Sequence, residues 1–388
     1  MKRSSVLDLL TAAALCLLLG SCLPGSNEKK FETLETTISD QAVGSNFSLH
    51  VQDDQLYMIY PSLDALSLNL SSAEITPESL QPTLEQTKYL DRISYSPDIG
   101  EDFGKHLFLV SDPYYHILYV DRESQDNSVL KWLSRTDEEE SWWIDAFPGL
   151  TDPLAGVPEA DGNLEVVFSE GRNLSLYRLH ATAQPELLAT TSPPSGALVP
   201  VGKTCVIRRG DDWAFSVYDA NSRRLYLVHP SQDSLRIEAV YASAAVHYVT
   251  ILDNRLYILV FDPAESTITM LERASIWQQA AEQRSFEVVP VTLCEGTTSV
   301  FMTNYNGEHL FLFTERIVEP QEEIRYQLSL LYPRSADGTY EKAALVEGEA
   351  RLEGFRAIRA ADTLYVLYLE TDRLRLLSVS LEQLARSP

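Results

Sequence analysis

The sequence has few basic residues and few cysteines, and after residue 22 it has no apolar run long enough to cross a bilayer as a helix. Its 31 lysines and arginines are outnumbered by 56 aspartates and glutamates, which gives a formal net charge of −25. Nucleic acids and anionic membrane surfaces are bound through clusters of basic residues. The charge balance therefore argues against both as partners, and it is compatible with a basic partner, with a cation or with solubility alone.

Motifs that carry enzyme chemistry are also missing. The sequence has no GxSxG, HExxH or CxxC motif and no glycine-rich phosphate loop, and its histidines lack ligand-like spacing. It therefore predicts no catalytic residue, no metal site and no cofactor. Cys205 and Cys294 leave two interpretations open, a single disulfide between them or two separate buried thiols.

The first 22 residues have the pattern of a targeting segment. Lys2 and Arg3 precede the apolar residues 9–19, which are too few to span a bilayer, and the segment ends in Leu19-Gly20-Ser21-Cys22. This ending resembles the lipobox of bacterial lipoproteins, in which the cysteine is acylated and becomes the mature N-terminus. The resemblance implies a signal peptide at residues 1–21 and lipidation of Cys22 by fatty acids such as palmitate.

The same resemblance implies a location. Two or three acyl chains on Cys22 anchor a protein stably in a lipid bilayer, because each buried methylene contributes about 0.8 kcal/mol. Leu23 is not aspartate, which in the sorting rule of Gram-negative lipoproteins indicates the outer membrane. Residues 22–30 are polar and rich in turn formers, so we expect them to be a tether that places the rest of the chain on the periplasmic or surface face of the envelope.

A β-hairpin unit recurs through the rest of the chain with a period of about 50 residues. Each unit has an apolar and aromatic first strand followed by a second strand, and the clearest unit, residues 252–273, joins them through turn residues 262–266 and has a second strand rich in β-branched residues. The first strands are residues 56–60, 107–110, 164–168, 213–217, 256–260, 310–313 and 364–368; the second strands are residues 66–70, 117–120, 174–179, 224–228, 267–271, 326–332 and 374–379.

Seven such units favour an all-β fold, a single β-propeller over residues 31–388 with seven blades of four antiparallel strands. Tandem β-sandwiches are the alternative, because they also alternate short strands and turns. One short helix is expected at residues 275–282. The last hairpin lacks an outer strand, and we expect residues 31–38 to supply it by pairing beside residues 374–379. The plan of a lipobox followed by a propeller is similar to that of the propeller lipoprotein of the outer-membrane barrel-assembly machinery, a likeness of architecture only.

One segment suggests a partner surface. Asp137, Glu138, Glu139 and Glu140 run directly into Ser141, Trp142 and Trp143. Four neighbouring carboxylates resist burial, so this run is expected in a solvent-facing loop. The two tryptophans then have two interpretations, as the start of a buried strand over residues 142–147 or as an exposed aromatic anchor for a basic protein.

These observations predict a lipid-anchored envelope protein that acts as a non-enzymatic binding or scaffolding propeller for protein partners. The alternative is a propeller enzyme, a hydrolase or a lactonase-like protein, whose loops place inward carboxylates around a metal at the central channel.

Overall fold

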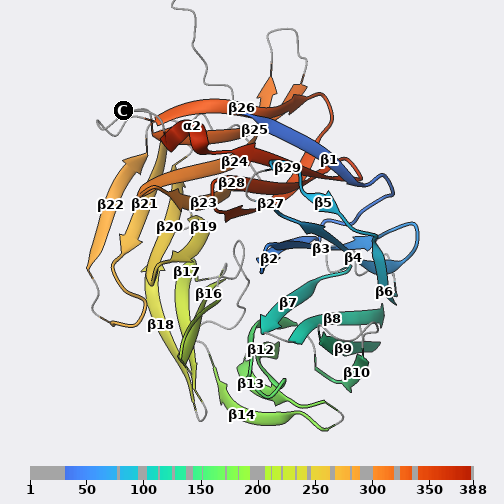
Figure 1. Ribbon diagram of the computed structural model, residues 1–388. Helices are drawn as coiled ribbons and strands as arrows, with labels where there is room; N and C mark the ends of the chain where they lie inside the picture. The colour runs from blue at the N-terminus through green and yellow to red at the C-terminus, as the bar shows by residue number, and fades with distance from the viewer. Residues whose placement is uncertain are drawn as a thin grey trace, which may run out of the picture. The chain divides into compact units, whose positions relative to one another are not determined.

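The computed structural model describes residues 31–385 except 77–78, 95–102, 112–113, 125–126, 137–142, 151, 171–172, 182, 193–205, 211, 220–221, 232–233, 243–245, 263–266, 280–281, 289–299, 319–323 and 334–339. The described part of the chain forms seven antiparallel sheets, which follow one another in chain order around a ring (Figure 1). We number these sheets as blades, and each blade is given from its inner to its outer strand.

Blade 1 contains β2 (Ser48–Gln52), β3 (Gln55–Ser62), β4 (Ser67–Glu74), β5 (Thr83–Leu84) and β6 (Lys88–Arg92), the last two both paired with β4. Blade 2 contains β7 (His106–Ser111), β8 (Tyr114–Ser124), β9 (Asn127–Thr136) and β10 (Trp143–Pro148). Blade 3 contains β11 (Pro153–Pro158), β12 (Leu164–Glu170), β13 (Asn173–Leu179) and β14 (Glu186–Thr191). Blade 4 contains β15 (Val206–Arg209), β16 (Asp212–Asp219), β17 (Arg224–Ser231) and β18 (Ser234–Ala242).

Blade 5 contains β19 (Val246–Leu252), β20 (Arg255–Asp262), β21 (Thr267–Arg273) and β22 (Gln283–Val288). Blade 6 contains β23 (Val300–Tyr305), β24 (Glu308–Val318), β25 (Ile324–Pro333) and β26 (Tyr340–Gly348). Blade 7 contains β27 (Leu352–Ala360), β28 (Thr363–Glu370), β29 (Arg373–Ser380) and, as its outer strand, β1 (Thr33–Ser39). The short helix α2 (Glu382–Ala385) follows, and the described part of the chain contains no helix with the length and apolar character that crossing a membrane requires.

The second strand of each blade is rich in apolar residues because it is buried on both faces. In β28 the six residues from Leu364 to Leu369 are all buried, because neighbouring blades cover both faces of the sheet. The outer strands instead alternate, as in β1, where exposed and partly buried residues follow each other.

Seven hydrophobic clusters hold the ring together, one between each pair of neighbouring blades. Leu118 and Trp132 of blade 2, for example, share a cluster with Val166 and Phe168 of blade 3. The other six clusters join blades 1 and 2, 3 and 4, 4 and 5, 5 and 6, 6 and 7, and 7 and 1. Neighbouring blades cover each other's faces and residues 31–388 form one compact unit, so the alternative of tandem sandwiches is wrong.

The predicted closing strand is confirmed. β1 pairs antiparallel with β29 from Thr33 opposite Val379 to Ser39 opposite Leu374, so the blue strand lies among the red strands of blade 7 (Figure 1). The Glu35 carboxylate accepts hydrogen bonds from the Tyr368 hydroxyl and the Arg375 guanidinium. The first and last strands of the propeller are thus joined within one sheet.

Two expectations need correction. In six repeats the predicted hairpin is formed by the second and third strands of the blade, but in blade 2 it is formed by the first strand β7 and the second strand β8. The two positions could not be distinguished in the sequence because residues 107–110 of β7 are as apolar as the second strands of the other blades. The helix expected at residues 275–282 is also wrong, since residues 274–279 form a bent loop between β21 and β22. The Arg273 side chain donates hydrogen bonds to the carbonyls of Ser275 and Gln278, which a helix would use for itself.

Candidate binding sites

The structure describes only some of the residues that the sequence predicted to form sites. Cys22, Trp142 and the four carboxylates Asp137, Glu138, Glu139 and Glu140 lie outside the described residues, as do Cys205 and Cys294. Trp143 is described, and it is the first residue of β10, the outermost strand of blade 2.

The start of β10 is exposed on both of its faces. Trp143 is 56% exposed and Ile144 is 50% exposed, although successive residues of a strand point in opposite directions. Only Phe147, near the end of the strand, is buried, where it packs against Trp132 with ring centroids 6.3 Å apart. The expectation of a buried strand at this position is therefore right for Phe147 and wrong for Trp143, because an outer strand has cover on part of its length only.

The backbone of β10 has a free edge within the described strands. β10 pairs with β9 through residues 143–148, and no other described strand pairs with it. Such an edge presents unpaired N–H and C=O groups that can accept a further strand. The exposed apolar side chains of Trp143 and Ile144 and the unpaired backbone N–H and C=O groups thus lie on the same strand.

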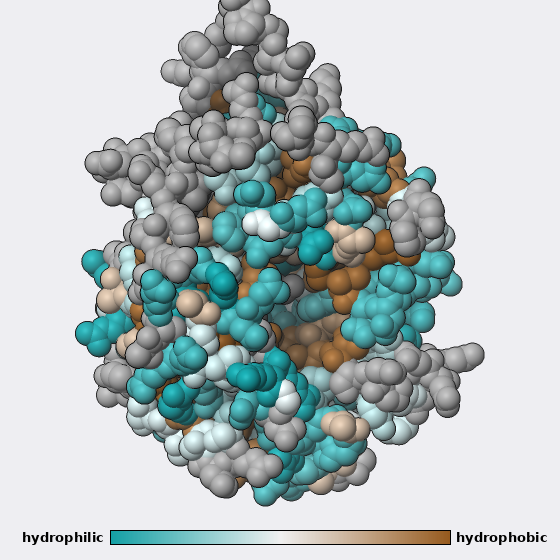
Figure 2. Space-filling view, turned by 60° about the vertical axis from the view of Figure 1, so that its left-hand side comes forward, coloured by the Kyte–Doolittle hydropathy of each residue, from teal (hydrophilic) through white to brown (hydrophobic). Residues whose placement is uncertain are grey.

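The inner strands surround an apolar opening. Figure 2 shows a hollow with hydrophobic walls near the middle of the face in view. A cavity of about 400 Å³ lies between β19, β23 and β27 and is lined mainly by apolar side chains, among them Tyr248, Phe301 and Ile358. Among the described residues that line it, Arg359 is the one with a charged side chain.

A second arginine of β27 has a different environment. The Arg356 guanidinium lies 5.1 Å from the centre of the Phe47 ring and donates a hydrogen bond of 2.9 Å to the Phe355 carbonyl. Burial lowers the pKa of Arg356, and burial together with the charge of Arg356 lowers the pKa of His106 to about 4. Within the described residues no group of three or more His, Cys, Asp or Glu residues could hold a metal ion.

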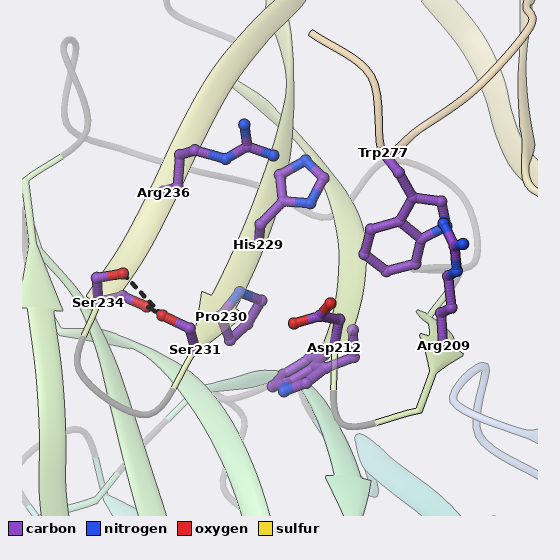
Figure 3. Close-up of a pocket in the computed structure, with 9 residues that line it drawn as sticks. Arg209, Asp212, His229, Pro230, Ser231, Ser234, Arg236 and Trp277 are labelled. Carbon is purple, nitrogen blue, oxygen red and sulfur yellow. Dashed lines mark hydrogen bonds between the residues drawn. The ribbon is translucent and has the colours of Figure 1, made fainter.

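A separate pocket of about 340 Å³ lies between blades 4 and 5, and Figure 3 shows its side chains. We call it the blade 4/5 pocket. Its residues come from the end of β15, the start of β16, the β17–β18 hairpin and the loop between β21 and β22. They are Arg209, Asp212, Trp213, His229, Pro230, Ser231, Ser234, Arg236 and Trp277.

The charges in this pocket are unusual for so acidic a chain. Two arginines face one carboxylate, and His229 is 7% exposed with its Nε2 atom buried and without a hydrogen-bond partner among the described residues. Burial lowers the pKa of His229 to about 4, and the nearby positive charges of Arg236 and Arg273 add to this. The imidazole is therefore neutral at neutral pH.

A third cavity, of about 560 Å³, is lined by a charge cluster that holds blades 1 and 2 together. The Lys131 ammonium lies 2.9 Å from the Asp91 carboxylate and 2.7 Å from that of Asp121, and the Tyr119 hydroxyl also donates to Asp91. Burial alone would raise the pKa of Asp91, but the hydrogen bonds from Tyr119 and Lys131 outweigh it and lower this pKa. Each charged group of the cluster already has a partner, which is typical of a structural joint.

Comparison with known proteins identifies the architecture. No protein-family model and no curated protein matches the chain. A solved structure described as YCF48 bound to D1 peptide matches 92% of this chain and 97% of its own, with 11% identity and a TM-score of 0.53. The chain is a seven-bladed β-propeller.

Two further solved structures resemble this propeller less closely. The WD40 domain of SCAP from fission yeast covers 91% of this chain and 98% of its own, at 9% identity and a TM-score of 0.45. A Trypanosoma rangeli sialidase in complex with sialic acid covers 91% of this chain and 60% of its own, at 10% identity and a TM-score of 0.41.

Sequence reasoning missed the blade 4/5 pocket. Its residues lie on five segments of two blades, and no two of the ionisable ones have a spacing that marks a site. The signal available in the sequence was Arg208-Arg209 before the turn into Asp212-Trp213, which alone does not distinguish a pocket from a solvated turn.

Proposed function

We propose that the protein is a lipid-anchored envelope protein whose propeller binds another protein at the outer edge of blade 2. One observation carries the proposal, the exposure of Trp143 and Ile144 together on an unpaired edge strand. Tryptophan is among the residues that contribute most to protein interfaces, because its large apolar area becomes buried in a partner's pocket.

Charge indicates the kind of partner. The chain carries a net charge of −25. The four carboxylates from Asp137 to Glu140 are separated from Trp143 by only two residues in the sequence. Rim carboxylates attract a basic partner and speed its association, while the aromatic side chain supplies affinity. The partner is therefore a basic protein that adds an extended segment along β10.

Two other observations support the proposal. The solved propeller described as YCF48 is bound to a peptide, so a related architecture has a protein ligand. The envelope location rests on the lipobox resemblance at Leu19-Gly20-Ser21-Cys22.

Trp143→Ala tests the surface, with Leu187→Ala as a matched control. Leu187 is 53% exposed on β14, the outer strand of the next blade, so both substitutions remove an exposed apolar side chain from an edge strand. Full-length variants are cross-linked in native envelopes, and the cross-linked proteins are identified. We expect Trp143→Ala to lose a basic partner that the wild type and Leu187→Ala retain.

Stability distinguishes binding from folding. Since Trp143 is more than half exposed, its removal is expected to change the free energy of unfolding by less than about 1 kcal/mol. A loss of about 3–5 kcal/mol, typical of a buried tryptophan, would show a core role instead. An unchanged set of partners in folded Trp143→Ala would exclude this edge as the binding surface.

A further inference from the structure

We propose that the blade 4/5 pocket binds a small organic monocarboxylate, whose carboxylate lies between Arg209 and Arg236 and whose apolar body packs against Trp277. This site is separate from the β10 edge, which belongs to blade 2. Figure 3 shows the two arginines on opposite sides of the pocket, with His229 and Asp212 between them.

The balance of charge selects an anion with a single charge. Among the described residues of the lining, two guanidinium groups and the Asp212 carboxylate give a net charge of +1, since His229 is neutral. Neither Arg209 nor Arg236 has an ion pair with a carboxylate of the described residues, unlike Arg273, which lies 2.9 Å from Glu238. A guanidinium binds a carboxylate through two parallel hydrogen bonds, so a monocarboxylate satisfies both its shape and its charge.

His229 provides the second reason for a ligand. Its Nε2 atom is buried and has no hydrogen-bond partner among the described residues, although buried polar atoms are nearly always paired. A neutral imidazole can carry its proton on either nitrogen. A carboxylate oxygen beside the ring would accept the proton of the Nε2 tautomer and complete its hydrogen bonding.

The apolar wall of the pocket is held in position before a ligand arrives. The Trp277 Nε1–H donates to the Asn254 side chain at 3.3 Å, and its ring centre lies 5.9 Å from that of His229. Trp213 stacks on Phe215 and donates to the Glu165 carboxylate at 3.1 Å. A fixed aromatic wall loses little conformational freedom on binding, and a volume of about 340 Å³ is at the small end for ligand pockets.

The test begins with three probes of the full-length wild-type protein at constant ionic strength. Isothermal titration calorimetry measures binding of phenylacetate, its neutral analogue phenylacetamide and inorganic phosphate. We expect phenylacetate to bind at least about tenfold more tightly than either other probe, because the amide lacks the charge and the phosphate dianion is repelled by Asp212. Equal affinity for the amide, tighter binding of phosphate or no binding of phenylacetate would each overturn the proposal.

Variants then locate the site. Arg236→Gln and Arg209→Gln are each expected to weaken phenylacetate binding at least about tenfold. Arg208→Gln is the matched control, because this arginine neighbours Arg209 on β15, does not line the pocket and carries the same charge. Should one of the pocket variants fail to fold, the other tests the same contact from the opposite side. Unchanged affinity in a folded Arg236→Gln or Arg209→Gln, or an equal loss in Arg208→Gln, would refute the assignment.

Discussion

His116 is a fully buried titratable side chain of blade 2. Its exposed fraction is 0%, and the Trp132 Nε1–H donates to its Nδ1 atom at 3.2 Å, so the imidazole proton is on Nε2. Burial lowers the pKa of His116 to about 4, well below the value of about 6.5 that histidine has in an unfolded chain.

This depressed pKa predicts a dependence of stability on pH. Between pH 6.5 and pH 4 the unfolded chain binds a proton at His116 and the folded protein does not, so the free energy of unfolding falls as the pH falls. Replacing His116 with Gln, which keeps an acceptor for Trp132, should reduce the slope near pH 5 by about 1.4 kcal/mol per pH unit. Urea denaturation of both proteins from pH 4.5 to 7 measures this slope, and identical slopes would show that His116 is protonated in the folded state.

At the scale of single residues, the sequence showed which side chains are polar or apolar but not which of them are exposed in the fold. The two-residue turns between the first and second strands of three blades, Asp53-Asp54, Asp253-Asn254 and Asn306-Gly307, have positive φ at both positions, a conformation that Asp, Asn and Gly adopt most readily. Trp143 was placed on a strand, but nothing in its neighbours distinguishes an outer strand from an inner one. The blade 4/5 pocket was missed because its arginines, histidine and tryptophan meet only when two blades pack together.

Among the elements, β1 contributes to the stability of the propeller, and truncation can measure this contribution. Phe31, just before β1, is 8% exposed and packs edge-on against Tyr332 with ring centroids 5.1 Å apart. Deleting residues 24–30 should leave the melting temperature nearly unchanged. Deleting residues 24–40 removes Phe31, the ladder to β29 and the Glu35 carboxylate, and should lower the melting temperature by more than about 5 °C.

Differential scanning calorimetry of the two deletions provides the comparison. Equal melting temperatures would mean that β1 adds no stability to blade 7. A fall in both would assign a structural role to residues 24–30 as well.

The elements themselves were predictable to different extents. Hairpins could be found because second and third strands are apolar throughout and have turn residues between them, so blade number follows from counting. The position of a strand within its blade could not be found, as β7 shows, because an inner strand covered by neighbours can be as apolar as a second strand. The loop after β21 has helical composition, but local hydrogen bonds from the Arg273 side chain and a long-range one from the Ile276 N–H to the Asn254 carbonyl decide its path.

For the whole molecule, the lipobox resemblance predicts that attachment to a membrane depends on Cys22. If the lipobox resemblance is correct, the processed wild-type protein partitions into the detergent phase, since acyl chains contribute about 0.8 kcal/mol for each buried methylene. Cys22→Ala should remain in the aqueous phase while its propeller stays folded. Phase partitioning in Triton X-114 makes this comparison, and a Cys22→Ala protein that partitions like the wild type would contradict lipidation at this residue.

The pairing of β1 with β29 also determines when, during synthesis of the chain, the ring of blades can close. A chain is synthesised from its N-terminus, so β1 emerges before the other described strands, but its partner at residues 373–380 is made after all of them. During that interval β1 has no native neighbour, and the apolar faces of blades 7 and 1 have nothing to cover them. The ring can close only after residues 373–380 have been made, so a chain that stops before residue 373 would keep an open first and last blade and be a substrate for proteases and chaperones.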